Sequence, residues 1–83
     1  MGICAISTWL DVELTCSACS AAIGDIEKYG GTCYNYCLQF GHRGCVATHV
    51  SNSGTCVIDS THSCDYVASN PICECQAAES NQD

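Results

Sequence analysis

Two pairs of closely spaced cysteines and three histidines are the residues whose types and spacing could hold a metal ion. Cys16 and Cys19 form a C-x-x-C pair, and Cys33 and Cys37 form a C-x-x-x-C pair. Thiolate and imidazole are ligands that tetrahedral zinc prefers. The histidines that follow these pairs are His42, His49 and His62. A zinc site made from these four cysteines would leave the six other cysteines as thiols, so we expect no metal ion and no cofactor.

Catalysis by a cysteine or serine nucleophile has little support in the sequence. A C-x-x-C redox site needs a thioredoxin-like βαβ setting and a thiol of low pKa, and neither is indicated here. No G-x-S-x-G elbow occurs, and a disulfide scaffold of 83 residues offers little room for a substrate cleft. The i, i+2 carboxylate pairs Asp11/Glu13 and Asp25/Glu27 would point to different sides of a helix. We therefore predict a non-enzymatic protein, with its histidines on the surface or in loops.

Cysteine content is the strongest compositional signal. Ten of the 83 residues are cysteine, above the roughly 8–10% that marks short disulfide-built chains. A chain this short buries little apolar surface, and each disulfide contributes typically about 2–4 kcal/mol. We predict that all ten cysteines form structural disulfides in a secreted protein, or in another oxidising lumen. They are Cys4, Cys16, Cys19, Cys33, Cys37, Cys45, Cys56, Cys64, Cys73 and Cys75.

The charge balance is strongly acidic. Lys28 and Arg43 stand against nine carboxylates, and the formal net charge is -7. Phosphate backbones and anionic membranes are repelled by such a surface. We therefore expect no nucleic-acid partner and no binding to anionic membranes. A protein partner or self-association is expected instead.

The first ten residues lack the pattern of a signal peptide. They carry no basic residue, and Asp11 and Glu13 follow before a long apolar stretch develops. We therefore expect that a targeting segment has already been removed. One disulfide-rich domain is predicted over residues 1–76, followed by a polar tail over 77–83.

The first third of the chain is predicted to form one long helix. Ser7 or Thr8 fits an N-cap, and Gly30 follows Tyr29 as a stop signal. Apolar residues between these ends recur at intervals of three and four, which is the spacing of a buried helical stripe. The stripe consists of Trp9, Val12, Cys16, Cys19, Ile23 and Ile26. Both cysteines of the stripe are therefore expected on the buried face of this helix.

The rest of the chain predicts a short helix and a few strands. A helix is expected over 33–40, with Thr32 as its cap. Segments 45–50 and 55–59 flank a turn and predict a hairpin, and 72–76 predicts a last strand. The fold class is therefore α+β. We expect a small disulfide-rich domain in which a long N-terminal helix and a short C-x3-C helix pack on a two- or three-stranded antiparallel sheet.

The cysteines of the short helix and the last strand have matching spacings. Residues i and i+4 share one face of a helix, and residues i and i+2 share one face of a strand, so two adjacent disulfides can join such elements. This pattern resembles the cysteine-stabilised αβ modules of defensins and scorpion toxins. The matching pieces are Cys33 and Cys37, Gly54-Thr55-Cys56, and Cys73 and Cys75. The resemblance, which covers residues 33–75, implies the pairs Cys33–Cys73 and Cys37–Cys75.

A rival pairing stays open. If the two predicted helices run antiparallel, they bring Cys16 to Cys37 and Cys19 to Cys33. The cysteine spacings alone do not decide between the two arrangements.

Large aromatic side chains are the candidate contact residues, because they bury much area at little entropic cost. The candidates are Trp9, Tyr29, Tyr34 and Tyr66. Tyr34 is expected on the outer face of the short helix. Tyr36 and Phe40 are expected to pack beneath the cysteines.

These features predict a secreted, non-enzymatic, disulfide-stabilised recognition or signalling protein that acts through surface contacts. In composition, this small acidic chain with ten cysteines is similar to some ciliate pheromones, which implies a soluble signal. The alternative is a structural or accessory subunit of a larger extracellular or lumenal assembly. In that case the N-terminal helix would dock through Trp9, Leu10 and Leu14.

Overall fold

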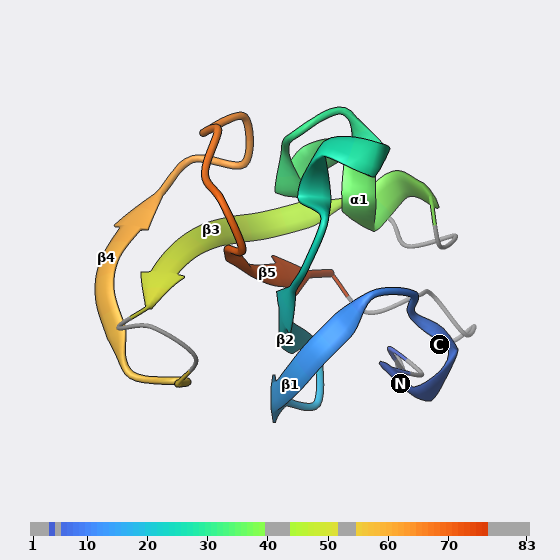
Figure 1. Ribbon diagram of the computed structural model, residues 1–83, viewed down its shortest axis with the longest axis horizontal. Helices are drawn as coiled ribbons and strands as arrows, with labels where there is room; N and C mark the ends of the chain where they lie inside the picture. The colour runs from blue at the N-terminus through green and yellow to red at the C-terminus, as the bar shows by residue number, and fades with distance from the viewer. Residues whose placement is uncertain (1–3, 5, 40–43, 52–54, 77–83) are drawn as a thin grey trace, which may run out of the picture.

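A five-stranded antiparallel sheet and one short α-helix make up the fold (Figure 1). The computed structural model describes residues 4, 6–39, 44–51 and 55–76, so the predicted tail over 77–83 lies outside the described residues. The elements in chain order are 3-10 helix η1 (Ile6–Thr8), β1 (Val12–Ser17), β2 (Ser20–Ile23), 3-10 helix η2 (Ile26–Tyr29), α1 (Cys33–Gln39), β3 (Cys45–Ser51), β4 (Ile58–His62) and β5 (Ile72–Cys75). Among these residues, no helix has the length and hydrophobicity needed to span a membrane.

The prediction of a long N-terminal helix is wrong, because this part of the chain forms a β-hairpin. β1 pairs with β2, and Ser17 lies opposite Ser20, which leaves two residues for the turn. Asp11 and Asp25 flank the hairpin with φ angles of 59° and 51°, in the left-handed region that interrupts regular structure. All four residues of β2 are buried, and a fully buried strand shows no alternation that would distinguish it from a helix.

The sheet is larger than the two or three strands expected. Its order is β1-β2-β5-β3-β4, with β5 in the centre. The predicted hairpin and last strand are confirmed as the β3–β4 pair and β5. The two additional strands come from the segment that was expected to be helical, and β2 joins the sheet by pairing with β5.

Two disulfides fasten α1 to β5. Cys33 pairs with Cys73 and Cys37 pairs with Cys75, with Cα–Cα distances of 5.2 and 5.5 Å. All four residues are at most 2% exposed. The short helix is confirmed, and these are the two pairs that the resemblance implied.

The other three disulfides are Cys4–Cys19, Cys16–Cys56 and Cys45–Cys64. The rival pairing of Cys16 and Cys19 with the cysteines of α1 is therefore wrong. Its premise was a pair of antiparallel helices, and one of those helices is a hairpin.

The Cys16–Cys56 disulfide shows that the sheet is strongly curved. Cys16 lies on edge strand β1, and Cys56 comes two residues before β4, the opposite edge strand. In a flat five-stranded sheet the outer strands would be roughly 19 Å apart, because neighbouring strands are spaced by about 4.8 Å. The Cα atoms of the two cysteines are 5.5 Å apart, so the two edges approach each other at this end.

The core lies between α1 and the sheet, with Tyr36 at its centre. Tyr36 is fully buried, as expected, whereas Phe40 lies outside the described residues. The core cluster comprises Cys4, Trp9, Ala21, Ile23, Ile26, Cys33, Tyr36, Cys37, Cys73 and Cys75. Half of these residues are cysteines, so disulfide sulfur supplies much of the buried volume that aliphatic side chains supply elsewhere.

Thr48 offers a direct test of this core. It is fully buried on β3 opposite Cys73, and its hydroxyl has no hydrogen-bond partner among the described residues. Thr48→Val replaces the hydroxyl by a methyl group of similar size, and an unsatisfied buried polar group costs about 1–3 kcal/mol. We therefore expect the variant to be more stable by about 1 kcal/mol in guanidinium unfolding with all disulfides intact. A less stable variant would show that the hydroxyl has a partner.

Candidate functional site

Trp9 and Tyr29, two of the candidate contact residues, pack against Tyr36. The ring centroids of Trp9 and Tyr36 are 5.8 Å apart at 70°, and those of Tyr29 and Tyr36 are 4.8 Å apart at 83°. Both are edge-to-face arrangements, which aromatic pairs favour. Trp9 is 5% exposed, and its indole N–H donates to the carbonyl oxygen of Cys4 at 2.8 Å. The Trp9 ring therefore belongs to the core and is not presented to a partner.

Tyr29 also joins a polar cluster at the edge of this aromatic core. Its hydroxyl donates to the Asp11 carboxylate at 2.5 Å, and the Lys28 ammonium lies 3.5 Å from Asp11 and 3.9 Å from Asp25. The hydrogen bond from Tyr29, opposed by desolvation and assisted by the charge of Lys28, holds the pKa of Asp11 below its ordinary value of 3.8. The same hydrogen bond, together with desolvation, raises the pKa of Tyr29 from 10.0 to about 12.

These shifts predict a loss of stability at both ends of the pH range. The pKa of Asp11 is lowered on folding. Its contribution to the stability of the fold is therefore complete above pH 3.8, and it is lost as the pH falls through the pKa that Asp11 has in the folded protein. The pKa of Tyr29 is raised on folding, so its contribution is complete below pH 10.0 and is lost as the pH rises toward about 12. We expect the unfolding temperature, followed by circular dichroism, to fall in both windows.

Tyr29→Phe is the matched variant for this pH dependence, because it keeps the ring and removes the hydroxyl that binds Asp11. We expect the unfolding temperature of this variant to fall less than that of the wild type, both at acidic and at alkaline pH. Burial raises the pKa of Tyr36 as well, so part of the alkaline loss remains in the variant. Identical pH profiles for the two proteins would contradict the role of this hydrogen bond.

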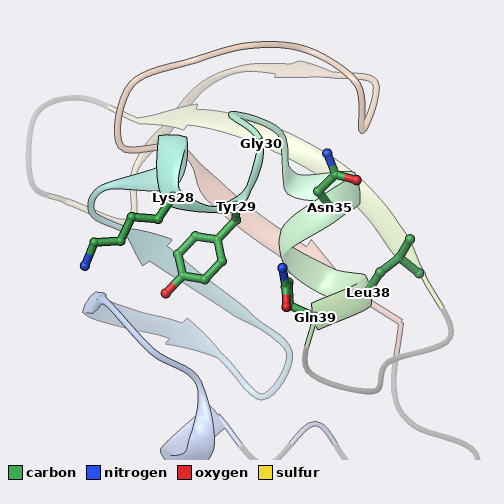
Figure 2. Close-up of a pocket in the computed structure, with 6 residues that line it drawn as sticks. All are labelled: Lys28, Tyr29, Gly30, Asn35, Leu38 and Gln39. Atoms are coloured by element: carbon green, nitrogen blue, oxygen red, sulfur yellow. The ribbon is translucent and has the colours of Figure 1, made fainter.

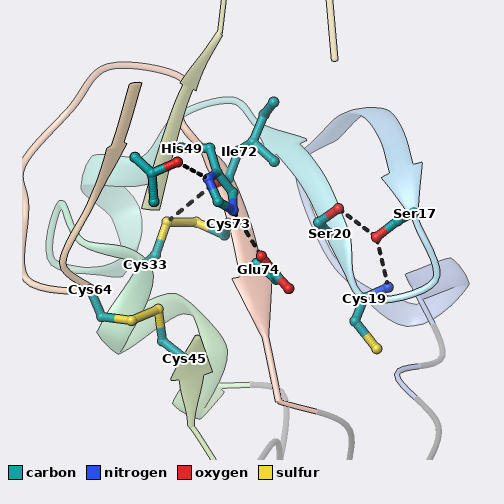
Figure 3. Close-up of polar contacts among 11 residues, drawn as sticks. Ser17, Cys19, Ser20, Cys33, Cys45, His49, Cys64, Ile72, Cys73 and Glu74 are labelled. Atoms are coloured by element: carbon teal, nitrogen blue, oxygen red, sulfur yellow. Dashed lines mark hydrogen bonds and ion pairs between the residues drawn. A yellow bond between two sulfur atoms is a disulfide. The ribbon is translucent and has the colours of Figure 1, made fainter. Parts of the chain in front are cut away.

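His49 connects three strands through its ring (Figure 3). Its Nε2 lies 2.8 Å from Glu74 Oε1 on β5, and its Nδ1 lies 2.9 Å from Thr61 Oγ1 on β4. The Glu74 carboxylate only accepts hydrogen bonds, so Nε2 carries a proton. In the neutral ring, Nδ1 then accepts the hydroxyl proton of Thr61. His49 is only 9% exposed, so the expectation of a surface or loop position is wrong for this residue.

A hydroxyl, an imidazole and a carboxylate are also the three groups of a catalytic triad, in which the imidazole acts as the base for a hydroxyl nucleophile. Here, however, Thr61 lies directly opposite His49 in the β3–β4 register, and Glu74 is two residues from Ile72, which lies opposite His49 on β5. Strand pairing alone thus brings the three side chains together. We interpret the chain of hydrogen bonds as a cross-strand link that holds β4 and β5 to β3.

The cysteine and histidine sets considered for metal or redox chemistry are not brought together as thiols. Every cysteine is in a disulfide, so none supplies a thiolate in this structure. Within the described residues, no group of three or more histidine, cysteine, aspartate or glutamate side chains is placed to hold a metal ion. His62 stacks on Tyr66, with ring centroids 3.8 Å apart, and His42 lies outside the described residues.

The remaining candidates, Tyr34 and Tyr66, are exposed around one junction of the backbone. The Tyr34 N–H donates to the carbonyl oxygen of Cys64 at 3.1 Å, and Thr32 forms a β-bridge with Val67. Residues 64–67 are therefore held against the start of α1 (Figure 1). Tyr34 is 52% exposed, Tyr66 40% and Val67 72%. We call Tyr34, Tyr66 and Val67 the contact surface.

Val67 was not a sequence candidate. An apolar residue beside a loop tyrosine was the available signal, but only the bridge to Thr32 places it near Tyr34. The exposure of Tyr34 on the outer face of the short helix is confirmed.

Comparison with family models, curated proteins and solved structures finds no match to this chain. The structure itself defines the class as a small disulfide-rich domain with one short α-helix and a five-stranded antiparallel sheet. Its five disulfides fit an oxidising environment such as that of secreted proteins. The resemblance to cysteine-stabilised αβ modules stays a prediction.

Proposed function

We propose that this chain is a secreted, non-enzymatic recognition or signalling protein that binds a protein partner through the contact surface. The observation that carries the proposal is the exposure of two tyrosines and a valine around one backbone junction. Tyrosine is enriched among the residues that dominate binding energy, because it offers a large apolar face and a polar tip.

The disulfide frame supports this role by limiting the motion of both tyrosines. Tyr34 follows Cys33, which is bonded to Cys73, and Tyr66 comes two residues after Cys64, which is bonded to Cys45. Binding by side chains on a fixed backbone loses less conformational entropy than binding by a mobile loop. The frame therefore favours recognition without rearrangement.

The charge of the chain indicates what kind of partner fits. The net charge is -7, and Asp65 directly precedes Tyr66 of the contact surface in the sequence. A partner with an apolar pocket surrounded by basic side chains complements this surface and is attracted to it over a distance. Association should consequently slow as the salt concentration rises.

The test is competition binding on intact cells of the source organism with fluorescently labelled protein. We expect saturable binding that unlabelled wild-type protein displaces, and we expect Tyr34→Ala and Tyr66→Ala each to weaken displacement by about tenfold or more. Val46→Ala is the control, because Val46 is similarly exposed at 51% but lies on β3. Binding that is not saturable, or tyrosine variants that compete as well as Val46→Ala, would contradict the proposal.

The alternative function, an accessory subunit, depended on an N-terminal helix that docks into a larger assembly. The predicted N-terminal helix is a hairpin, and Trp9 is buried in the core. Leu10 and Leu14 remain exposed at 59% and 39%, but they belong to no common helical face. We therefore retain recognition as the single proposed function.

A further inference from the structure

A depression of about 380 Å³ lies between the end of η2 and the outer side of α1. Its volume falls at the lower end of the roughly 300–1,000 Å³ that small-molecule sites occupy. It is lined by Lys28, Tyr29, Gly30, Asn35, Leu38 and Gln39. Only small ligands of one or two rings fit a hollow of this size.

Two carboxamides supply the polar lining. Asn35 and Gln39 are four residues apart on α1, so they lie on the same side of the helix. Each carboxamide offers two donors and one acceptor oxygen, and neither is hydrogen-bonded to any residue in the part of the chain that the structure describes. In Figure 2 the Gln39 amide lies between the Tyr29 ring and α1, and Asn35 lies toward Gly30.

Gly30 makes room for the Asn35 amide. A Cβ atom at this position would lie 2.5 Å from Asn35 Nδ2, and the φ angle of Gly30 is +83°, which disfavours any other residue. A larger residue at position 30 would therefore displace the Asn35 amide from the wall of the depression.

The charges around the depression exclude a strongly ionic ligand. No lining residue is acidic, so a cation has no counter-charge there. Lys28 is the one basic lining residue, and its ammonium is already close to Asp11 and Asp25, at 3.5 and 3.9 Å. An anion would compete with both carboxylates and approach a protein of net charge -7. The ligand that fits is neutral, hydroxyl-rich and apolar on one face.

We propose that this depression binds a neutral saccharide. The C–H face of one sugar ring packs against Tyr29 and Leu38, and its hydroxyl groups exchange hydrogen bonds with the carboxamides of Asn35 and Gln39. Carboxamides suit hydroxyl groups because both kinds of group donate and accept. The contact surface contributes no residue to this site, so the proposal is independent of the proposed protein recognition.

The test has two steps, and both use the oxidised full chain. First, the labelled protein is applied to an array of neutral, sialylated and sulfated oligosaccharides. We expect binding to neutral glycans only. Second, ¹⁵N-labelled protein is titrated with the best neutral disaccharide, and we expect saturable amide shifts at Tyr29, Gly30, Asn35 and Gln39. The affinity should be about millimolar, since few hydrogen bonds and a shallow site limit it.

Variants separate this site from general surface effects. Asn35→Ala and Gln39→Ala should each weaken saccharide binding about threefold to tenfold, which is the value of one or two net hydrogen bonds. Gln76→Ala removes an exposed carboxamide outside the depression and should leave binding unchanged, as should Tyr34→Ala and Tyr66→Ala. The proposal is overturned by neutral glycans that give neither array hits nor saturable amide shifts in the titration, by stronger binding of acidic glycans, or by a Gln39→Ala variant that binds like wild type.

Discussion

Replacing Cys33 and Cys73 together by alanine is expected to unfold the protein at physiological temperature. The disulfide closes a sequence separation of 40 residues, for which the chain-entropy model gives a loss of about 4 kcal/mol. Both residues are fully buried between α1 and β5, so the missing sulfur atoms leave a cavity that costs about 1–2 kcal/mol more. The sum is comparable to the whole stability of a small domain, about 5–15 kcal/mol.

The Cys16–Cys56 disulfide provides a matched control. It closes the same sequence separation of 40 residues, so the chain-entropy loss is the same. Cys56 is exposed and Cys16 is half-buried, however, so the double alanine variant leaves no comparable cavity. In guanidinium unfolding with the other four disulfides intact, we expect Cys16→Ala with Cys56→Ala to be the more stable of the two variants by about 1–2 kcal/mol. Equal losses would contradict the contribution of burial.

The parts of the fold that the sequence predicts correctly are those with local signals. The short helix has a threonine before it and cysteines four residues apart, and the β3–β4 hairpin and β5 have strand-like composition between turn residues. Cysteine content predicts a disulfide scaffold because a chain this short needs cross-links. The pairs Cys33–Cys73 and Cys37–Cys75 follow from spacing only once a helix and a strand are known to face each other.

The N-terminal hairpin has no such local signal. Its turn contains Ala18 and Cys19, without glycine or asparagine, and the register shifts in β1 disturb the alternation of its side chains. The Cys4–Cys19 and Cys16–Cys56 disulfides also hold this segment through partners distant in the sequence. Tertiary cross-links therefore decide the structure here, and they override a spacing that would suit a helix.

The candidate site residues divide in the same way, into those with a local sequence signal and those that depend on residues distant in the sequence. Exposure of Tyr34 follows from its place on α1, because its neighbours Cys33 and Cys37 define the buried face. The burial of Trp9 and the strand-linking role of His49 depend on residues distant in the sequence: Tyr36 for Trp9, and Thr61 and Glu74 for His49. The depression between η2 and α1 depends on how two segments pack, so no single motif predicts it.

Tyr36→Ala is expected to be the most damaging single substitution outside the cysteines, with a loss of about 3–5 kcal/mol. Tyr36 is fully buried and lies in edge-to-face contact with both Trp9 and Tyr29. Removing its ring opens a cavity and leaves the two other rings without a common partner. Because those rings fix the segments before β1 and at the end of η2, the amide signals of both segments should also shift.

Two further variants separate the contributions of the ring and the hydroxyl. The Tyr36 hydroxyl donates to the carbonyl oxygen of Leu10 at 2.6 Å, so Tyr36→Phe should cost about 1 kcal/mol through loss of that hydrogen bond alone. Tyr34→Ala lies on the same helix but removes a side chain that is 52% exposed, and it should stay within about 0.5 kcal/mol of wild type. Unfolding free energies that rank Tyr36→Phe with Tyr36→Ala would place the main contribution in the hydrogen bond. The ring packing predicts instead that the loss for Tyr36→Phe lies much closer to that of the exposed Tyr34→Ala than to that of Tyr36→Ala.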